Sequence, residues 1–264
     1  MKKEVSIEFE NESFKGWIDE KIAIVKVKSN AFFSLVDIDT SRRVLDWFEL
    51  VSAKNEINVI LILNEKGSLG STAYEIFVTE LTGREFKKQS ETTISEHDLI
   101  RVRSKEINIL NSFIRATINY GKLVISGLNG TIFTPFFGAS LAANYRFAST
   151  DMVISFTHPK YGIHPGGAIP FFLPKYIGPG RANQYLYSGG ELSVENALEL
   201  GLINKIVQTD NFEPECIKEA KILSELDSRY IRWTKLLSTP DKGDLIKYLR
   251  EEEKYVDQYK DLTE

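Results

Sequence analysis

The sequence has few of the residues that mark disulfide-stapled, secreted or membrane-spanning proteins. It contains one cysteine, Cys216, among 264 residues. A single cysteine excludes an intramolecular disulfide and fits a reducing compartment. No apolar run approaches the ~18 residues that a membrane-spanning helix needs. The start of the chain carries Lys2 and Lys3 but lacks the apolar segment of a secretory signal. These absences predict a cytoplasmic protein that does not bind membranes.

The sequence also has no large excess of charge of either sign. The 33 lysines and arginines nearly balance the 37 aspartates and glutamates, which leaves a net charge of −4. This balance gives no general attraction to nucleic acid or to an anionic membrane. The chain has only three histidines, and no third ligand lies at a helpful spacing from the two that are close together, so we expect no metal site. We expect no cofactor either.

What the sequence does contain is a regular succession of apolar runs. Continuous or alternating runs predict β-strands at residues 21–29, 57–63, 121–130 and 152–156. Helical spacing and capping residues predict helices at residues 39–53, 74–81, 95–119 and 134–144. The recurring order of strand, loop, helix and strand favours parallel β/α/β units and an α/β fold. From about residue 211 the chain becomes helical and charge-rich, with a last helix expected at 245–259.

Glycines and prolines stand at fixed places in the stretch from Gly127 to Val207. This stretch contains GLNGTIFTPFFGASLAANYRFAST, followed by HPKYGIHPGGAIPFFLPKYIGPG and SGGELSVENALELGLINKIV. The last piece reads as a turn, a helix capped by Ser193, a stop at Gly201 and a short strand. Together these pieces resemble the crotonase superfamily, the enoyl-CoA hydratase/isomerase group. The resemblance extends over residues 21 to 235.

The resemblance implies the fold, the assembly and the substrate class. Residues 1–208 are expected to form a crotonase-like spiral of ββα units. Residues 209–264 are expected to form a helical C-terminal region that packs on the core and joins chains into homotrimers or hexamers. The expected ligand is an acyl thioester of CoA or of an acyl carrier protein. Members of this superfamily stabilise an enolate-like intermediate with two backbone N–H groups, the oxyanion hole.

The first oxyanion donor of the superfamily corresponds to the N–H of Leu69, in the loop after the strand at 57–63. Gly70 beside it lets the backbone come close to a ligand. The alternative is that the glycines of this loop only turn the chain. The second donor corresponds to Pro135, which has no N–H. Thr134 as N-cap and Pro135 as first helical residue make a good helix start, and the N–H groups of Phe136 and Phe137 are then free at a helix N-terminus.

Neither catalytic carboxylate of the hydratases has a counterpart. Gly138 stands at the first glutamate position, and Lys160 replaces the second in a Pro159–Lys160 pair. Hydration of a double bond needs a base for water and an acid for the α-carbon. Ordinary enoyl-CoA hydratase activity is therefore not expected. The loop in which the isomerases place an acid reads His164-Pro-Gly-Gly here, without one.

Four polar residues remain as candidate catalytic groups: His158, Lys160, Tyr161 and His164. Histidine titrates near neutrality and can act as acid or base, so His164 is the first candidate for proton transfer. The other three are candidates for holding a substrate carboxylate. The alternative for either histidine is a structural role.

The segment KYGIHPGGAIPFFLPKYIG is similar to that of the decarboxylase-type crotonases of polyketide β-branching, which also carry Lys-Tyr-Gly here. The sequence therefore predicts a divergent crotonase-fold protein that acts on an acyl thioester by lyase, decarboxylase or isomerase chemistry. Two alternatives stay open. One is a non-catalytic homologue that serves as a binding or assembly subunit, and the other is unrelated chemistry on this fold.

Overall fold

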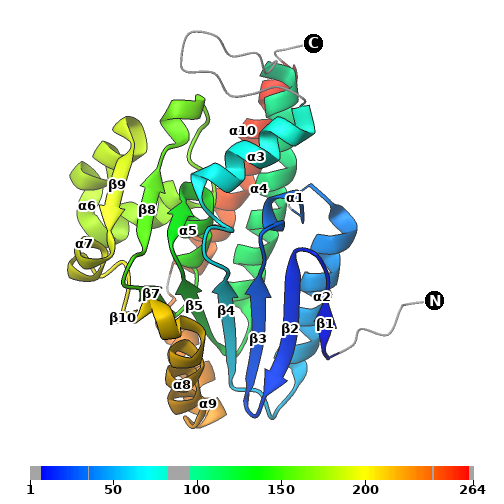
Figure 1. The fold of residues 1–264 in the computed structure, drawn as a ribbon, viewed down its shortest axis with the longest axis vertical. Coiled ribbons are helices and arrows are strands. Elements are labelled where there is room, and N and C mark those ends of the chain that lie inside the picture. The colour runs from blue at the N-terminus through cyan, green and yellow to red at the C-terminus, as the bar shows by residue number, and fades with distance from the viewer. Residues whose placement is uncertain (1–6, 35, 83–95, 240, 262–264) are drawn as a thin grey trace.

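The computed structural model describes residues 7–34, 36–82, 96–239 and 241–261. Two β-sheets, with helices packed around them, form the frame (Figure 1). The larger sheet has seven strands in the order β1-β2-β3-β4-β5-β7-β10, and the smaller has three in the order β6-β8-β9. From β3 to β10 the large sheet is parallel, and β1, β2 and β3 pair antiparallel at one end.

The strands are short, as expected for repeated ββα units. The large sheet consists of β1 (Phe9–Glu10), β2 (Phe14–Asp19), β3 (Ile22–Val27), β4 (Val59–Asn64), β5 (Leu123–Leu128), β7 (Tyr145–Ser149) and β10 (Lys205–Val207). The small sheet consists of β6 (Thr131–Phe133), β8 (Val153–Phe156) and β9 (Gly190–Ser193). The strands predicted at 21–29, 121–130 and 152–156 contain β3, β5 and β8, and the strand predicted at 57–63 overlaps β4, which ends one residue later.

The helices divide into those that cover the sheets and those of the C-terminal part. The first group consists of α1 (Ala31–Ser34), α2 (Ile38–Ala53), α3 (Ser71–Thr82), α4 (Glu96–Asn119), α5 (Thr134–Ser140), η1 (His158–Tyr161), α6 (Ile169–Ser188) and α7 (Val194–Glu199). The second consists of η2 (Thr209–Asn211), α8 (Phe212–Ser224), α9 (Ser228–Leu237) and α10 (Lys242–Asp261). None of the described helices is long and apolar enough to cross a membrane.

The period of two along each strand decides what packs on each face of the large sheet. On β3, Ile22 and Ile24 face the apolar side of α8, where Cys216 is buried. Ala23 and Val25 face the opposite side, toward α2 and α4. The large sheet is therefore buried on both faces, which explains why its parallel strands are continuous apolar runs.

Several helix boundaries differ from the sequence prediction, and α10 begins three residues before its expected start at 245. Helix α5 ends at Ser140 rather than near residue 144, because the chain turns there and Asn144 returns to the sheet, where its side chain accepts a hydrogen bond from Val124 N–H at 2.9 Å. Helix α3 begins at Ser71, three residues before the expected start. The predicted cap at Ser95 lies outside the described residues.

Candidate functional site

An apolar cavity lies between the large sheet and helices α2, α4 and α5. Its volume is about 120 Å³. Its wall comes from β3, β4, β5, the loop after β4 and the three helices, and includes Val25, Val27, Val44, Phe48, Ile62, Leu69, Leu110, Ile114, Ser126, Phe136 and Ala139. Leu69 and Phe136, the two positions predicted to offer oxyanion donors, therefore border the same cavity.

A hydrogen bond to the Leu69 carbonyl fixes the backbone at this residue. This carbonyl accepts a hydrogen bond from the N–H of Phe133 at 2.7 Å, which ties the loop after β4 to β6. No described residue accepts a hydrogen bond from the Leu69 N–H. Gly67 has φ +84°, a left-handed conformation that glycine adopts without strain. The loop thus leaves one fixed and unpartnered N–H beside the cavity.

The start of α5 differs from the predicted cap. Phe133 is the N-cap and Thr134 is the first helical residue, so Pro135 takes the second position. The Thr134 hydroxyl does not cap the helix but bonds the Ser155 carbonyl at 3.0 Å. Phe136 is the third helical residue, and an N–H in the first turn has no partner inside the helix. The Phe137 N–H, one position later, has the Phe133 carbonyl as its helical acceptor. Phe136 is thus the better placed of the two predicted donors.

Backbone atoms of another segment occupy the space beside Gly138, which stands at the position of the first missing glutamate. A Cβ added to Gly138 would lie 2.5 Å from the carbonyl oxygen of Gly167. Gly167 has φ +71°, and a Cβ there would lie 1.9 Å from the carbonyl oxygen of Pro135. The loop at 163–168 therefore lies directly on the N-terminal part of α5, and no side chain fits between them.

His158 is buried and uses both ring nitrogens. Its Nε2 lies 2.8 Å from the Leu186 carbonyl, and its Nδ1 lies 3.0 Å from the Thr134 hydroxyl. Because a carbonyl only accepts, Nε2 carries the proton. Burial, with a smaller contribution from the charge of Arg103, lowers the pKa of His158 and favours the neutral ring. The ring joins α5 to α6, which is the structural role left open for it.

Lys160 and Tyr161 both contact Glu75 on α3. Lys160 Nζ lies 2.9 Å from Glu75 Oε1, and the Tyr161 hydroxyl donates to the same oxygen at 2.7 Å. These hydrogen bonds lower the pKa of Glu75 against the effect of partial burial, so the carboxylate is ionised at neutral pH. Tyr161 packs among aromatic rings that include Tyr74 and Phe133. Lys160, at the second glutamate position, thus joins η1 to α3.

His164 lies on the surface of the loop at 163–168 and is exposed. Its carbonyl accepts a hydrogen bond from Arg103 NH2 at 2.9 Å. In the part of the chain that the structure describes, none of the four predicted polar residues lines the apolar cavity.

A polar groove with a volume of about 930 Å³ lies outside the cavity, and Ser34 lines both. Four acidic residues and one described lysine line the groove: Glu12, Asp37, Glu65, Glu80 and Lys66. The lysine is paired with Asp151 at 2.5 Å. No group of three or more metal-ligating side chains occurs among the described residues.

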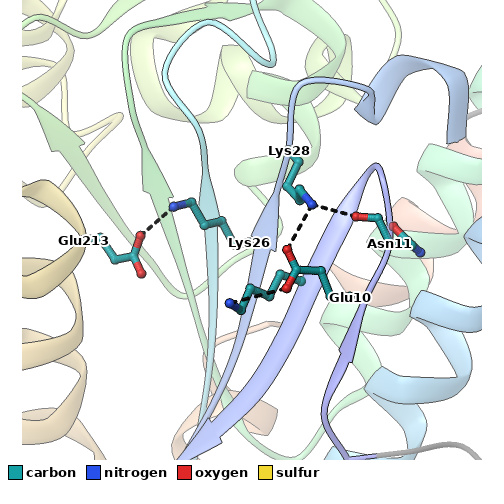
Figure 2. Close-up of polar contacts among 6 residues, drawn as sticks. Glu10, Asn11, Lys26, Lys28 and Glu213 are labelled. Carbon is teal, nitrogen blue, oxygen red and sulfur yellow. Dashed lines mark hydrogen bonds and ion pairs between the residues drawn. The ribbon is translucent and has the colours of Figure 1, made fainter.

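Two lysines at the C-terminal end of β3, Lys26 in the strand and Lys28 just after it, are paired as well. Lys28 donates to Glu10 at 3.1 Å and to the Asn11 carbonyl at 2.8 Å, and Lys26 donates to Glu213 at 2.8 Å (Figure 2). Figure 2 shows Lys28 directed toward the start of the chain and Lys26 toward α8. These two cations thus hold the β1–β2 segment and α8 in place.

Comparison with known proteins assigns this architecture. An enoyl-CoA hydratase from Mycobacterium avium subsp. paratuberculosis has a TM-score of 0.72 at 17% identity, with 95% of each chain covered. An enoyl-CoA hydratase from Bacillus halodurans has a TM-score of 0.70 at 21% identity, covering 94% of this chain and 95% of that one. The fold is therefore the crotonase fold, a mixed α/β architecture with C-terminal helices.

The family follows from the sequence. The family model described as Enoyl-CoA hydratase/isomerase matches residues 84–261. This chain belongs to the enoyl-CoA hydratase/isomerase family. The match to a crotonyl-CoA hydratase of Syntrophomonas wolfei is 32% identical over 105 residues, 39% of this chain and 40% of that protein. A fatty acid oxidation complex subunit alpha of Pseudomonas putida is 28% identical over 174 residues, 65% of this chain and 23% of that protein. These matches span less than half the length of either relative.

Three parts of the site were not predicted from the sequence. One is the cavity, whose wall is assembled from strands and helices that are far apart in the chain. Another is Glu75, which has no sequence signal of its pairing with Lys160. The third is a buried charged cluster of Arg103 and Glu106 on α4 and Glu252 on α10. The spacing of three residues between Arg103 and Glu106 could have suggested their ion pair, whereas Glu252 stands among consecutive glutamates typical of an exposed face.

Proposed function

We propose that this chain binds an acyl thioester, with the acyl group in the apolar cavity and the thioester oxygen at the Leu69 N–H. The observation that carries this proposal is the unpartnered Leu69 N–H in a loop that borders an apolar cavity, which Phe136 also lines. An apolar cavity of about 150 Å³ binds a molecule as large as benzene. A cavity of about 120 Å³ therefore suits a short acyl chain of roughly four carbons.

The charges that line the groove favour an uncharged part of the ligand there. Its four carboxylates and one paired lysine disfavour phosphate groups. The pantetheine arm, which CoA and acyl carrier proteins share, carries no charge. We propose that this arm occupies the groove, with the nucleotide or the carrier protein outside it. Acyl-pantetheine is then expected to bind about as tightly as acyl-CoA, and a large preference for CoA would contradict this placement.

The chemistry supported best is enolate-stabilising lyase, decarboxylase or isomerase chemistry. Loss of CO₂ from a malonyl-type thioester leaves the electron pair of the broken C–C bond on the α-carbon, and the negative charge spreads to the thioester oxygen. That oxygen needs a hydrogen-bond donor, and the α-carbon then needs one proton. Neither step requires the two carboxylates that this chain lacks. We propose that solvent supplies this proton, because His164, the candidate from the sequence, is exposed and does not line the cavity. His164→Ala is therefore expected to leave both such turnover and the fold intact.

The second candidate is a non-catalytic homologue that binds a thioester or serves in an assembly. Two observations favour it. Gly138 is closed by the carbonyl of Gly167, and Lys160 and His164 do not line the cavity. On this proposal the Leu69 N–H binds a ground-state carbonyl and no enolate forms.

Calorimetric titration tests the binding proposal. Each buried methylene contributes about 0.8 kcal/mol, so butyryl-CoA is expected to bind roughly 10-fold more tightly than acetyl-CoA. Ala139→Leu places a larger side chain in the cavity wall and is expected to remove this preference. Ala53→Leu, at the exposed end of α2, serves as control and should keep it. Absence of binding by either ligand, or an unchanged preference in Ala139→Leu, would contradict the proposal.

Two assays separate the candidates. Release of CO₂ from malonyl-CoA, or exchange of the α-hydrogens of bound butyryl-CoA with deuterium from solvent, reports a stabilised enolate. Either result supports catalysis. Binding without CO₂ release and without exchange supports the non-catalytic homologue.

We also propose that the chain forms a homotrimer or hexamer. One face of α9 exposes four large apolar side chains, Tyr230, Trp233, Leu236 and Leu237, which are 58%, 62%, 61% and 77% exposed. Contiguous exposed apolar groups mark interaction sites. Light scattering should give a trimeric or larger mass, and Trp233→Lys should reduce it. A monomeric mass at micromolar concentration would contradict the proposal.

A further inference from the structure

The wall of the apolar cavity contains a buried hydroxyl for which the protein provides no partner. Ser126 of β5 lines the cavity and is only 6% exposed. Among the described residues, none forms a hydrogen bond with its side chain. A buried hydroxyl without a hydrogen bond is unfavourable. A ligand that supplies the missing partner therefore gains affinity.

The strand pattern turns this side chain toward the cavity. Successive side chains of a strand point to opposite faces of the sheet. Ile125 packs in the cluster that contains Cys216 of α8, and a Cβ added to Gly127 would lie 3.3 Å from the Cys216 sulfur. Ser126 stands between these two residues and so points to the other face. Val124, two residues earlier, packs on that face toward α2 and α4.

The neighbours of Ser126 on the adjacent strands do not satisfy its hydroxyl. Ile62 of β4 and Arg146 of β7 stand in register with it. Ile62 is apolar and lines the cavity as well. Arg146 directs its guanidinium to the carbonyls of Leu202 and Ala143, at 2.6 Å and 2.9 Å. The sheet therefore leaves the hydroxyl open toward the cavity.

The other polar side chains of the cavity wall differ from Ser126. The hydroxyls of Ser34 and Ser140 each donate to a carbonyl of their own helix at 2.6 Å. The amide of Asn64 binds the backbone at residues 65 and 129. Thr117 of α4 is only partly buried. Within the described wall, Ser126 is thus the deeply buried hydroxyl that is left for a ligand.

The surroundings of Ser126 decide which group suits its hydroxyl. A buried water usually makes about three hydrogen bonds, and the wall around Ser126 is otherwise apolar or already paired. An ionised group would lose its hydration without a counter-ion, because no charged side chain lines the described cavity. The group that fits is a neutral oxygen on an otherwise apolar chain.

The position of Ser126 along the sheet sets where this oxygen lies in the ligand. Leu69 belongs to the loop that follows the end of β4 at Asn64. Ser126 is opposite Ile62, two residues before that end, which is ~7 Å along the strand at ~3.3 Å per residue. An acyl chain with its thioester oxygen at the Leu69 N–H therefore reaches Ser126 with its far end.

We propose that Ser126 is a specificity-determining residue that binds a terminal hydroxyl of a short acyl group. The preferred thioester then carries a hydroxylated chain rather than a plain alkyl chain. This assignment rests on the proposed function, because the acyl group must occupy the cavity. It adds the chemical class of the chain, which an apolar wall alone does not specify.

Calorimetric titration with two ligands of similar size tests this assignment. 4-Hydroxybutyryl-CoA carries a terminal hydroxyl where pentanoyl-CoA carries a methyl group, so the ratio of their dissociation constants isolates the effect of the hydroxyl. The wild type is expected to prefer 4-hydroxybutyryl-CoA. Ser126→Ala is expected to shift the ratio about 10-fold or more toward pentanoyl-CoA, because the ligand hydroxyl is then buried without a partner. Ser126→Cys, with a weaker hydrogen-bonding group, should give an intermediate ratio.

Ser140→Ala is the matched control, because it removes the same atom from the same wall, but its hydroxyl already donates to the Phe137 carbonyl. It should keep the wild-type ratio. A wild-type preference for pentanoyl-CoA, an unchanged ratio in Ser126→Ala, or a shift produced by Thr117→Val instead would overturn the assignment. These three outcomes leave the thioester proposal standing. Failure of the wild type to bind either ligand would overturn both.

Discussion

The region between Phe136 and the large sheet differs from the region between Phe136 and the loop at 163–168. On the sheet side lies an apolar cavity that Leu69 lines. On the loop side, the Gly167 carbonyl closes the space beside Gly138, and Lys160 and Tyr161 contact Glu75. The difference shows that the two parts of the predicted site diverge: the loop around Leu69 borders a cavity, whereas the space beside Gly138 is closed. The following predictions test this contrast.

The largest expected effect is the absence of hydration. Crotonyl-CoA is expected to be hydrated at least ~10⁴-fold more slowly than by an ordinary hydratase, because a general acid–base group contributes ~10²–10⁴ and an oxyanion donor ~10²–10³. Loss of the enoyl absorbance in a stopped assay measures the rate. Gly138→Glu should not restore it, since its side chain would collide with the Gly167 carbonyl. Turnover near that of a hydratase would show that the loop side is not closed.

Gly167→Ala should destabilise the protein more than any other change on the loop side. The added Cβ would lie 1.9 Å from the Pro135 carbonyl at a φ of +71°, so we expect a loss of about 3–4 kcal/mol. Gly162→Ala is the control, because Gly162 has φ +64° with no atom within 4 Å of the added Cβ. It should cost only about 1 kcal/mol. Urea unfolding measures both, and equal losses would mean that the loop does not press on α5.

Glu252→Gln should change how stability depends on pH. The pKa of Glu252 is raised from 4.5 to about 7 in the folded protein, so folding takes up a proton between these values. Wild-type stability is therefore expected to fall as the pH rises from 4.5 through 7, by up to about 3 kcal/mol. The variant should lack this fall. Urea unfolding at pH 5 and pH 8 compares them, and parallel curves would assign the charge to another group.

The smallest effect on the free energy of unfolding is expected from Lys160→Ala. Its ion pair with Glu75 is largely exposed, and such pairs contribute about 0–1 kcal/mol. Tyr161→Phe should cost more, about 1–2 kcal/mol, because a buried hydrogen bond to a charged carboxylate is lost. A loss of thioester binding in Lys160→Ala, with unchanged stability, would instead place Lys160 in the ligand site.

The order of strands and helices could be predicted from the sequence because each element carries its own local pattern. The run at 57–63 is β-branched and buried, and Ser193 caps α7 as expected, accepting from the Asn196 N–H at 3.4 Å. The helix start at Thr134 was off by one residue because the N-cap, Phe133, has no capping side chain. A cap of this kind leaves no mark in the sequence.

The site was harder to predict than the fold, because its geometry depends on contacts between distant segments. Leu69 and Phe136, predicted as oxyanion donors, line one cavity, and their role stays a prediction. The sequence could not show that Gly138 is closed by Gly167, or that Glu75 on α3 accepts from both Lys160 and Tyr161. These contacts join segments far apart in the chain, and single residues give no signal of them.

The short edge strand of the large sheet has a consequence for association between chains. Strand β1 spans only Phe9–Glu10, and its carboxylate is held by Lys15 at 3.5 Å and Lys28 at 3.1 Å. A short and charged edge is a poor template for pairing with the strand of another molecule. This end of the sheet is thereby guarded against strand-to-strand aggregation, and the exposed face of α9 is left as the favoured surface for ordered contacts between copies.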